Sequence, residues 1–243
     1  MLGRVKTEPL WQWGAYGKQP WVKDYFKVGP AFPLLNGFAD WIEKGYGTVV
    51  TKGAPADRQH SWRFWTRDSR QGHVICGVVR DSADALGRPY PFMIIGAGPL
   101  EGWDKKWDLL PFALDNVWGQ ADYLCTRMYG DSRVFEVEVS SLRPPVPEWP
   151  TYEQERDRFS MDWPEPDPSA SQSLGQTEGL IEIEDQTQGH LTAVALSLCH
   201  RAMKRRVDTP PNAVFMGGTL DRTYLAHFRR PLNTSDFTRL WTV

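Results

Sequence analysis

The chain has 243 residues, a formal net charge of −2 and a charged fraction of 24%, and 41% of its residues are hydrophobic. This length suffices to bury a core without disulfide or metal staples, and the composition excludes both a disordered chain and a strongly basic nucleic-acid binder. Aromatic residues are unusually frequent, with 12 Trp, 11 Phe and 8 Tyr, so the rings form a core, a ligand platform or a partner surface.

Glycine and proline punctuate the first 30 residues, which predicts loop with at most one short edge strand. From Leu35 to Ile42 the apolar residues recur with helical spacing, and this pattern predicts a helix that ends near the glycines of residues 45–47. Residues 61–66 then alternate between apolar and polar side chains, which predicts a short strand.

The central part of the chain carries the clearest periodic patterns. Two β-branched runs, 73–80 and 90–96, predict buried strands joined by the polar loop 81–89 as a wide hairpin. Beyond a Trp-rich connector, an apolar stripe over 111–128 predicts a helix. The alternation over 134–139 predicts a half-buried strand.

A proline-rich stretch separates this central part from the last third. Seven prolines lie between residues 144 and 168, and a Ser/Gln-rich run follows, which is typical of a linker or a surface-wrapping segment. The remaining patterns predict short helices and strands, in chain order a helix over 151–161, a helix over 191–206, strands over 213–216 and 223–228, and a closing helix with Thr234 or Ser235 as its N-cap.

Interleaved strands and helices, with strands buried on both faces, predict an α/β fold in the mixed α+β sense. We expect a mixed β-sheet flanked by helices on both faces, with a smaller C-terminal α/β portion. The proline-rich stretch suggests three parts, an N-terminal α/β domain over 1–143, a connector over 144–178 and a C-terminal α/β subdomain over 179–243.

The tryptophans fall into groups by their local pattern. Those on apolar stripes or strand faces are expected in the core, and those in Gly- or Pro-punctuated segments are expected to pin irregular chain to it. The first group is Trp41, Trp62, Trp118 and Trp241, the second is Trp11, Trp13, Trp21, Trp149 and Trp163, and Trp65, Trp103 and Trp107 fit either.

Cysteine usage and the absence of long apolar runs predict a compartment. Cys76, Cys125 and Cys199 are widely spaced in apolar stretches, which favours free buried thiols in a reducing environment. The amino terminus lacks a signal-peptide pattern, and no stretch approaches the roughly 20 apolar residues of a membrane span. We therefore expect a cytoplasmic protein that is not an integral membrane protein and does not bind nucleic acid.

Sequence signatures of enzymes are missing. There is no phosphate-binding loop, dinucleotide fingerprint, nucleophile elbow, Cys-x-x-Cys pair or zinc-protease motif. His60 and Ser61, with Asp57 nearby, make a poor hydrolytic set because adjacent side chains on an extended segment point to opposite faces. We predict no catalytic residue, no metal ligand and no cofactor.

Two loops carry the candidate binding residues. Asp81, Asp84 and Arg88 converge in the hairpin loop, as a structural ion pair or Asx turn that braces the loop, or as a ligand or partner contact. In the N-terminal loop over 21–26, Lys23 and Asp24 lie among aromatic residues. There the charges and rings form a recognition patch, or the rings anchor the loop to the core while the charges face water.

Three motifs in order resemble a known family. The chain shows Y-G-K-Q-P and D-Y-F, then W-R-F, then G-V-V, Ser82 and G-R-P-Y-P-F at residues 16–20, 24–26, 62–64, 77–79, 82 and 87–92. These resemble the G-K-x-P…G-D-F, W-R-F and G-V…P-S-x-D-x-x-G-R-x-x-P-L patterns of the TagF (ImpM) family of type VI secretion accessory proteins. The resemblance covers about residues 14–130, and the patterns over 213–241 look like the end of longer members.

The resemblance implies a cytoplasmic α/β protein, not an enzyme, that controls type VI secretion after translation through contact with a forkhead-associated-domain protein. Two alternatives stay open. One is a hydrolase that uses Asp81, Asp84 and Arg88, and the other is an adaptor whose proline-rich middle docks a partner as an extended segment. The candidate partner contacts are Trp21, Lys23, Asp24, Phe26, Asp81, Asp84 and Arg88.

Overall fold

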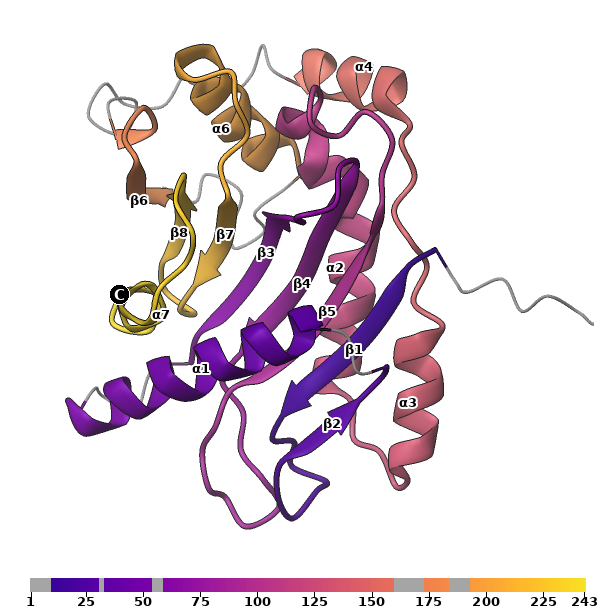
Figure 1. Ribbon diagram of the computed structural model, residues 1–243, viewed down its shortest axis with the longest axis vertical. Coiled ribbons are helices and arrows are strands. Elements are labelled where there is room, and N and C mark those ends of the chain that lie inside the picture. Colours follow the sequence, from indigo (N-terminus) through magenta and orange to yellow (C-terminus); the bar gives the residue numbers. More distant parts are fainter. Residues whose placement is uncertain (1–9, 31–32, 54–58, 160–172, 184–192) are drawn as a thin grey trace, which may run out of the picture.

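The computed structural model describes residues 10–30, 33–53, 59–159, 173–183 and 193–243 (Figure 1). Its strands are β1 (Gln12–Gly17), β2 (Phe26–Val28), β3 (Ser61–Arg67), β4 (His73–Arg80), β5 (Phe92–Pro99), β6 (Glu178–Ile183), β7 (Ala213–Gly218) and β8 (Thr223–Phe228). Its helices are α1 (Pro33–Thr51), the 3₁₀ helix η1 (Trp107–Leu109), α2 (Leu110–Thr126), α3 (Ser132–Ser140), α4 (Trp149–Phe159), α6 (Ala193–Arg206) and α7 (Thr234–Leu240).

All eight strands belong to one sheet, in the order β2-β1-β5-β4-β3-β7-β8-β6. The predicted fold class, strands and helices with the sheet covered on both faces, is confirmed. Every pairing between these strands is antiparallel, where the sequence predicted a mixed sheet. The reason is that β3, β4 and β5 follow one another through a turn and a loop, without the helical crossover that parallel neighbours need.

The last third of the chain enters the same sheet. Strand β7 pairs with β3, so that Trp65 lies opposite Val214, and β8 and β6 extend the sheet beyond it. The strands of 1–143 and those from β6 onward are therefore hydrogen-bonded neighbours. The division of the chain into three parts stays a prediction.

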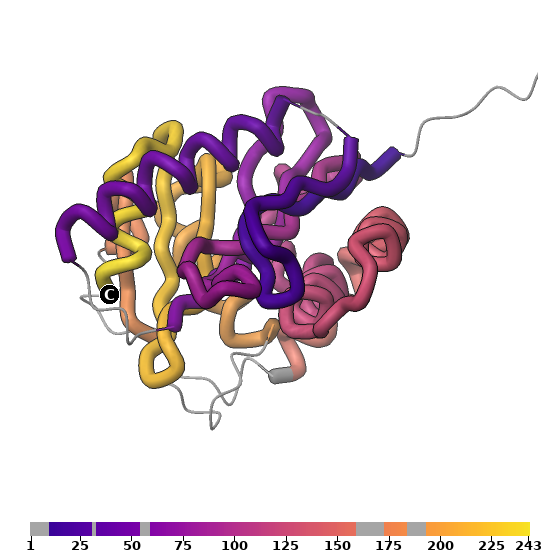
Figure 2. Tube along the Cα trace, turned by 90° about the horizontal axis from the view of Figure 1, so that it is seen from below, coloured from indigo at the N-terminus to yellow at the C-terminus, as the bar shows by residue number. Residues whose placement is uncertain are grey.

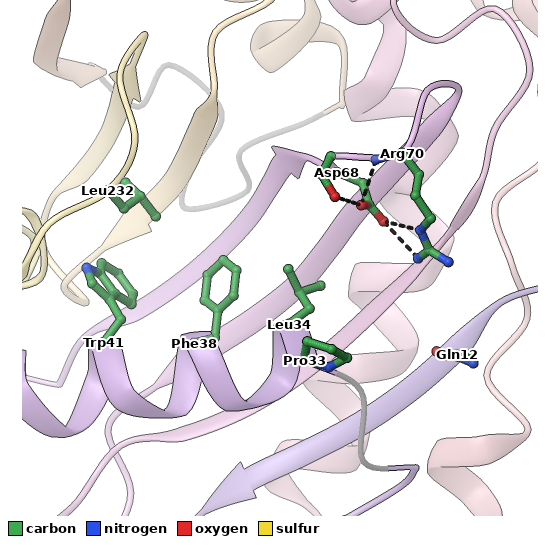
Figure 3. A pocket seen from close by; sticks show the side chains of 10 residues that line it. Gln12, Pro33, Leu34, Phe38, Trp41, Asp68, Arg70 and Leu232 are labelled. Atoms are coloured by element: carbon green, nitrogen blue, oxygen red, sulfur yellow. Dashed lines mark hydrogen bonds and ion pairs between the residues drawn. The ribbon is translucent and has the colours of Figure 1, made fainter.

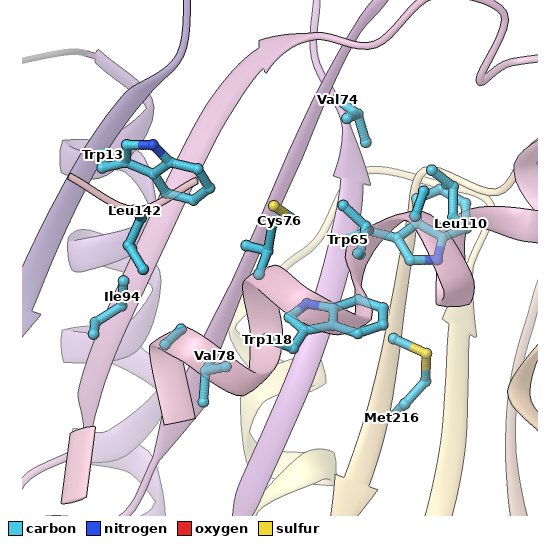
Figure 4. Close-up of a cluster of buried hydrophobic side chains, with 14 of the residues drawn as sticks. Trp13, Trp65, Val74, Cys76, Val78, Ile94, Leu110, Trp118, Leu142 and Met216 are labelled. Carbon is cyan, nitrogen blue, oxygen red and sulfur yellow. The ribbon is translucent and has the colours of Figure 1, made fainter. Parts of the chain in front are cut away.

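Two hydrophobic layers hold the helices to the two faces of the sheet. On one face α1 and α7 pack over Trp62 and Phe64, and on the other α2, α3 and α6 pack over Trp65 and its neighbours (Figures 2 and 4). The alternation of β3 sends Trp62 and Trp65 to opposite layers. Each large apolar side chain buried there contributes about 1.5–3 kcal/mol.

The sorting of the tryptophans is confirmed for most of the described rings. Three of the four predicted core rings are buried, Trp41 is partly exposed, and the three undecided rings are buried. Trp65 donates from Nε1 to His200 Nε2 at 3.0 Å, whereas the buried Nε1 atoms of Trp62 and Trp103 have no hydrogen-bond partner in the described part of the chain. Trp163 lies outside the described residues.

Residues 134–139 form a helix, α3, and the strand prediction for them is wrong. Asp131 caps this helix, and its side chain accepts a hydrogen bond from the backbone N–H of Arg133 at 2.8 Å. Phe135 and Val139, four residues apart, are buried against the sheet, whereas Val134 is exposed. The alternating pattern misled because a four-residue spacing is contained in a two-residue one.

Other element boundaries differ from those predicted from the sequence, for identifiable reasons. Helix α1 continues through Gly45 to Thr51, although the sequence predicted that it ends near these glycines. Gly45 serves helix packing, since a Cβ at this position would lie 2.4 Å from the Phe237 side chain of α7. Strand β1 is an inner strand, paired with β2 and β5. Asn233, in a capping box with Asp236, is the N-cap of α7.

The structure bears on the predicted state of the cysteines and on the predicted absence of a membrane span. All three cysteines are free thiols, and Cys76 and Cys125 are buried, as expected. Within the described residues, no helix combines the length and apolarity that a membrane crossing requires.

Candidate functional site

The two loops predicted to contact a partner lie against each other at one end of the sheet. The backbone N–H of Ala85 donates to the Val22 carbonyl at 2.8 Å, and the Arg88 guanidinium donates to the Lys23 carbonyl at 2.7 Å. Gly17, at φ +129°, lets β1 turn into the N-terminal loop. A Cβ at this position would lie 2.1 Å from the backbone oxygen of Pro91, just before β5. The two candidate segments therefore form one surface.

A buried ionic brace holds the loops together. The Asp84 carboxylate lies 3.1 Å from Lys18 Nζ and 2.7 Å from Arg88 Nε, and it also accepts the backbone N–H groups of Leu86 and Arg88 at 3.0 Å. Burial alone would raise the pKa of Asp84, but the Arg88 backbone N–H and the Lys18 and Arg88 cations hold that pKa well below its usual range. Asp84 is thus an ionised, fully engaged brace.

Asp81 makes its contacts elsewhere. Its Oδ2 accepts the backbone N–H of His60 at 2.8 Å and lies 3.0 Å from His60 Nδ1, while its Oδ1 accepts from Trp241 Nε1 at 2.6 Å. This carboxylate joins the start of β3 to the end of α7. The three residues of the predicted hydrolase cluster are therefore not gathered around one point, since Asp84 and Arg88 serve the brace and Asp81 serves this junction.

The N-terminal loop divides its aromatic side chains between core and solvent. Trp21 packs on Phe26, Tyr129 and Phe135 with ring centroids 5.0–5.4 Å apart, and Phe26 also stacks on a ring of β5. Lys23 and Asp24 are exposed. Of the candidates in this loop, the two aromatic ones face the interior and the two charged ones face water.

Tyr25 is the exposed ring of this surface. It is 50% exposed, packs edge-on against Tyr90 at 4.6 Å, and lies under Lys18 Nζ, which is 4.7 Å from its ring centroid. A cation over a ring face is attractive, so Lys18 both braces Asp84 and orients Tyr25. Leu86, 67% exposed, adds an apolar side chain on the second loop. Sequence reasoning did not list Tyr25, although its place next to Phe26 in an extended segment puts it on the opposite side.

A cavity of about 650 Å³ opens beside the braced loops. It is lined by the segment just before the N-terminal loop, by the hairpin loop, by the carboxyl-terminal ends of α1 and α2, and by the His60–Asp81–Trp241 junction, including Gln19, Ser82, Arg80, Val50, Arg127 and Met128. Sequence reasoning missed it, because Asp81 is 21 residues from His60 and 160 from Trp241. Asp57, considered with His60 in the sequence, lies outside the described residues.

A second groove lies away from this surface, along the first half of α1 (Figure 3). Leu34, Phe38 and Trp41 form its apolar floor, and the Asp68–Arg70 ion pair of the β3–β4 turn forms its lip. It contains none of the candidate contact residues. Among the described residues no group of three or more His, Cys, Asp or Glu side chains is placed to hold a metal.

Comparison with known proteins adds a family and a fold. The protein-family model described as TagF N-terminal domain, type VI secretion system-associated, matches residues 14–138. The chain is similar to the crystal structure of PA0076 from Pseudomonas aeruginosa PAO1, with 17% identity, a TM-score of 0.56, and coverage of 95% of this chain and 94% of that one. No curated protein matches. At this identity the likeness to the solved structure shows a shared fold.

Proposed function

Because the chain belongs to the TagF family of type VI secretion system-associated proteins, we propose that it is a regulatory accessory protein of such a system. It acts after translation on assembly or firing, by contact with another protein. The partner is a forkhead-associated-domain protein, and the site of action is the cytoplasm, where three free thiols stay reduced.

The observation that carries this proposal is the preorganised surface of the two loops. Tyr25 is exposed but held in place by Lys18 and Tyr90, and Asp24 and Leu86 lie on the same braced pair of loops. Tyrosine is enriched among the residues that dominate binding energy in protein interfaces. A surface that is already ordered loses less conformational entropy on binding, which favours affinity.

The same geometry favours contact over catalysis. A hydrolase that uses Asp81, Asp84 and Arg88 remains the alternative, but it needs a carboxylate free to take a proton. Both oxygens of Asp84 are engaged, and the oxygens of Asp81 accept hydrogen bonds from His60 and Trp241. We therefore propose that the chain is not an enzyme and uses these residues to shape a contact surface.

The test combines binding with secretion. The purified full chain should capture the purified forkhead-associated-domain protein of the same organism, and deletion of its gene should change secretion of the tube protein. Tyr25→Ala and Asp24→Lys should lose capture and fail to complement the deletion. Leu10→Ala is the matched control, because Leu10 is 80% exposed at the opposite end of β1. Unchanged secretion in the deletion of an otherwise active strain would overturn the proposal.

A further inference from the structure

The cavity beside the braced loops contains a cation that has no counter-ion among the described residues. Arg80, the last residue of β4, lines the cavity and is partly buried, and its side chain forms no ion pair with any described residue. The acids near it are already used, since Asp81 serves His60 and Trp241, and Asp122, which acts with Arg80 on Cys125, pairs with Arg63 at 2.9 Å. A partly buried arginine without an ion-pair partner favours the binding of an anion that is not part of the described chain.

A second group in the cavity wall also lacks a partner. His60 is 4% exposed, and its Nε2 has no hydrogen-bond partner within the described part of the chain. Because Nδ1 lies 3.0 Å from the Asp81 carboxylate, Nδ1 carries the proton and Nε2 presents a lone pair. Buried polar atoms are nearly always satisfied, and this acceptor needs a donor, which a backbone N–H of a bound extended segment would supply and a carboxylate would not.

The rim of the cavity is apolar and exposed. Val50 of α1 and Met128, just beyond α2, line the cavity and are 59% and 64% exposed. Large apolar side chains at this exposure, beside an unpaired cation, are typical of a surface that a protein segment covers, and methionine adapts its shape to such a contact.

We propose that this cavity receives an acidic side chain from an extended segment of a protein partner. The carboxylate pairs with Arg80, and apolar side chains beside it in the segment pack on Val50 and Met128. The charge of the unpaired arginine selects an acidic segment over a neutral or basic one. The inference rests on the proposed function, since it names the chemistry by which the same surface recognises its partner.

Peptide binding to the full chain tests the proposal. The probes are the peptide acetyl-Gly-Leu-Glu-Leu-Glu-Gly-amide, the same peptide with Gln in place of Glu, and sodium glutarate and sulfate. The readout is the indole N–H resonance of Trp241, which lines the cavity and is assigned by its loss in Trp241→Phe. We expect the Glu peptide to shift this resonance and the Gln peptide to bind about tenfold more weakly.

Substitutions in the wall and on the rim separate charge from shape. Arg80→Met should weaken the Glu peptide about tenfold, and Arg133→Met, at an exposed arginine of α3, should leave it unchanged. Met128→Glu and Met128→Lys both remove the apolar contact of an exposed side chain, so the difference between them isolates charge, and the Lys variant should bind the Glu peptide about tenfold more tightly than the Glu variant. That difference would not result from lost packing, and the melting temperature of each variant checks its folding.

Several outcomes would overturn the proposal. These are equal binding of the Glu and Gln peptides, equal weakening by both Met128 variants, and glutarate or sulfate binding as tightly as the peptide, which indicates a free-anion site. Asp57→Asn tests an acid of this chain as the occupant, and a peptide affinity raised about tenfold in that variant would also count against us. If Arg80→Met still captures the full partner while Tyr25→Ala does not, the cavity proposal fails and the proposed function stands.

Discussion

Replacing Asp81 with alanine should loosen the carboxyl-terminal helix from the start of β3. The Asp81 carboxylate accepts three hydrogen bonds there, from the backbone N–H and Nδ1 of His60 at 2.8 and 3.0 Å and from Trp241 Nε1 at 2.6 Å. Both partner residues are buried. The substitution therefore leaves three buried donors without their acceptor.

The size of the effect follows from those donors. A hydrogen bond to a charged group contributes about 1.5–3 kcal/mol, and a buried donor left unsatisfied costs about 1–3 kcal/mol. Because the Asp81 side chain is 24% exposed, water replaces part of the loss, and we expect Asp81→Ala to lower the free energy of unfolding by about 3 kcal/mol. Trp241→Phe keeps most of the ring and loses one bond, so about 1.5 kcal/mol is expected.

Urea unfolding of both single variants and the double variant measures the coupling between the two side chains. The two substitutions remove the same hydrogen bond, so the double variant should be more stable than the sum of the single effects by about 1–2 kcal/mol. Asp24→Ala is the control, since that side chain is 71% exposed and should change stability by no more than about 0.5 kcal/mol. Strict additivity, or an Asp81→Ala effect as small as that of the control, would refute the junction.

Three further predictions concern other parts of the fold. Burial lowers the pKa of His200 from 6.5 to about 4, so below pH 6.5 the unfolded chain binds a proton that the folded chain does not. The free energy of unfolding should therefore fall by up to about 3 kcal/mol as the pH is lowered from 6.5 to about 4. Urea unfolding at stepped pH should show a flatter profile for His200→Gln. Gly45→Ala drives a Cβ into a ring of α7 and should cost about 1–3 kcal/mol in thermal unfolding, while Gly47→Ala, which meets open space, should stabilise by about 0.5–1 kcal/mol. Arg88→Met removes donors to both braced loops, and hydrogen exchange at the Ala85 amide should be about tenfold faster.

Segments whose side-chain pattern is strong over many residues were predictable from the sequence. The stripe over 111–128 became α2, and the β-branched runs became β4 and β5, because local periodicity decides which side of an element faces the core. For residues 134–139 and 45–47, the prediction from the local pattern was wrong. There the outcome depended on Phe135 meeting the sheet and on Phe237 of α7 packing against Gly45, and neither contact is visible in a local pattern.

The candidate surface divides in the same way. That Asp84 and Arg88 brace a loop was one of the interpretations available from the sequence, because an Asx turn and an i,i+4 ion pair are local features. The participation of Lys18, the exposure of Tyr25 and the separation of Asp81 from its neighbours were not. They depend on contacts between segments that are far apart in the chain.

The sequence by itself determined the family, the class of fold and the two loops that carry the candidate contacts, because motif order, apolar periodicity and turn residues are properties of short stretches. Only the tertiary structure decided that the last third completes one antiparallel sheet and that a cavity lies beside the loops, in which Arg80 has no ion-pair partner from the described part of the chain. The physical reason is that a cavity, an ion pair across loops and a strand pairing join distant residues. Their free energies depend on distances that only the folded chain sets.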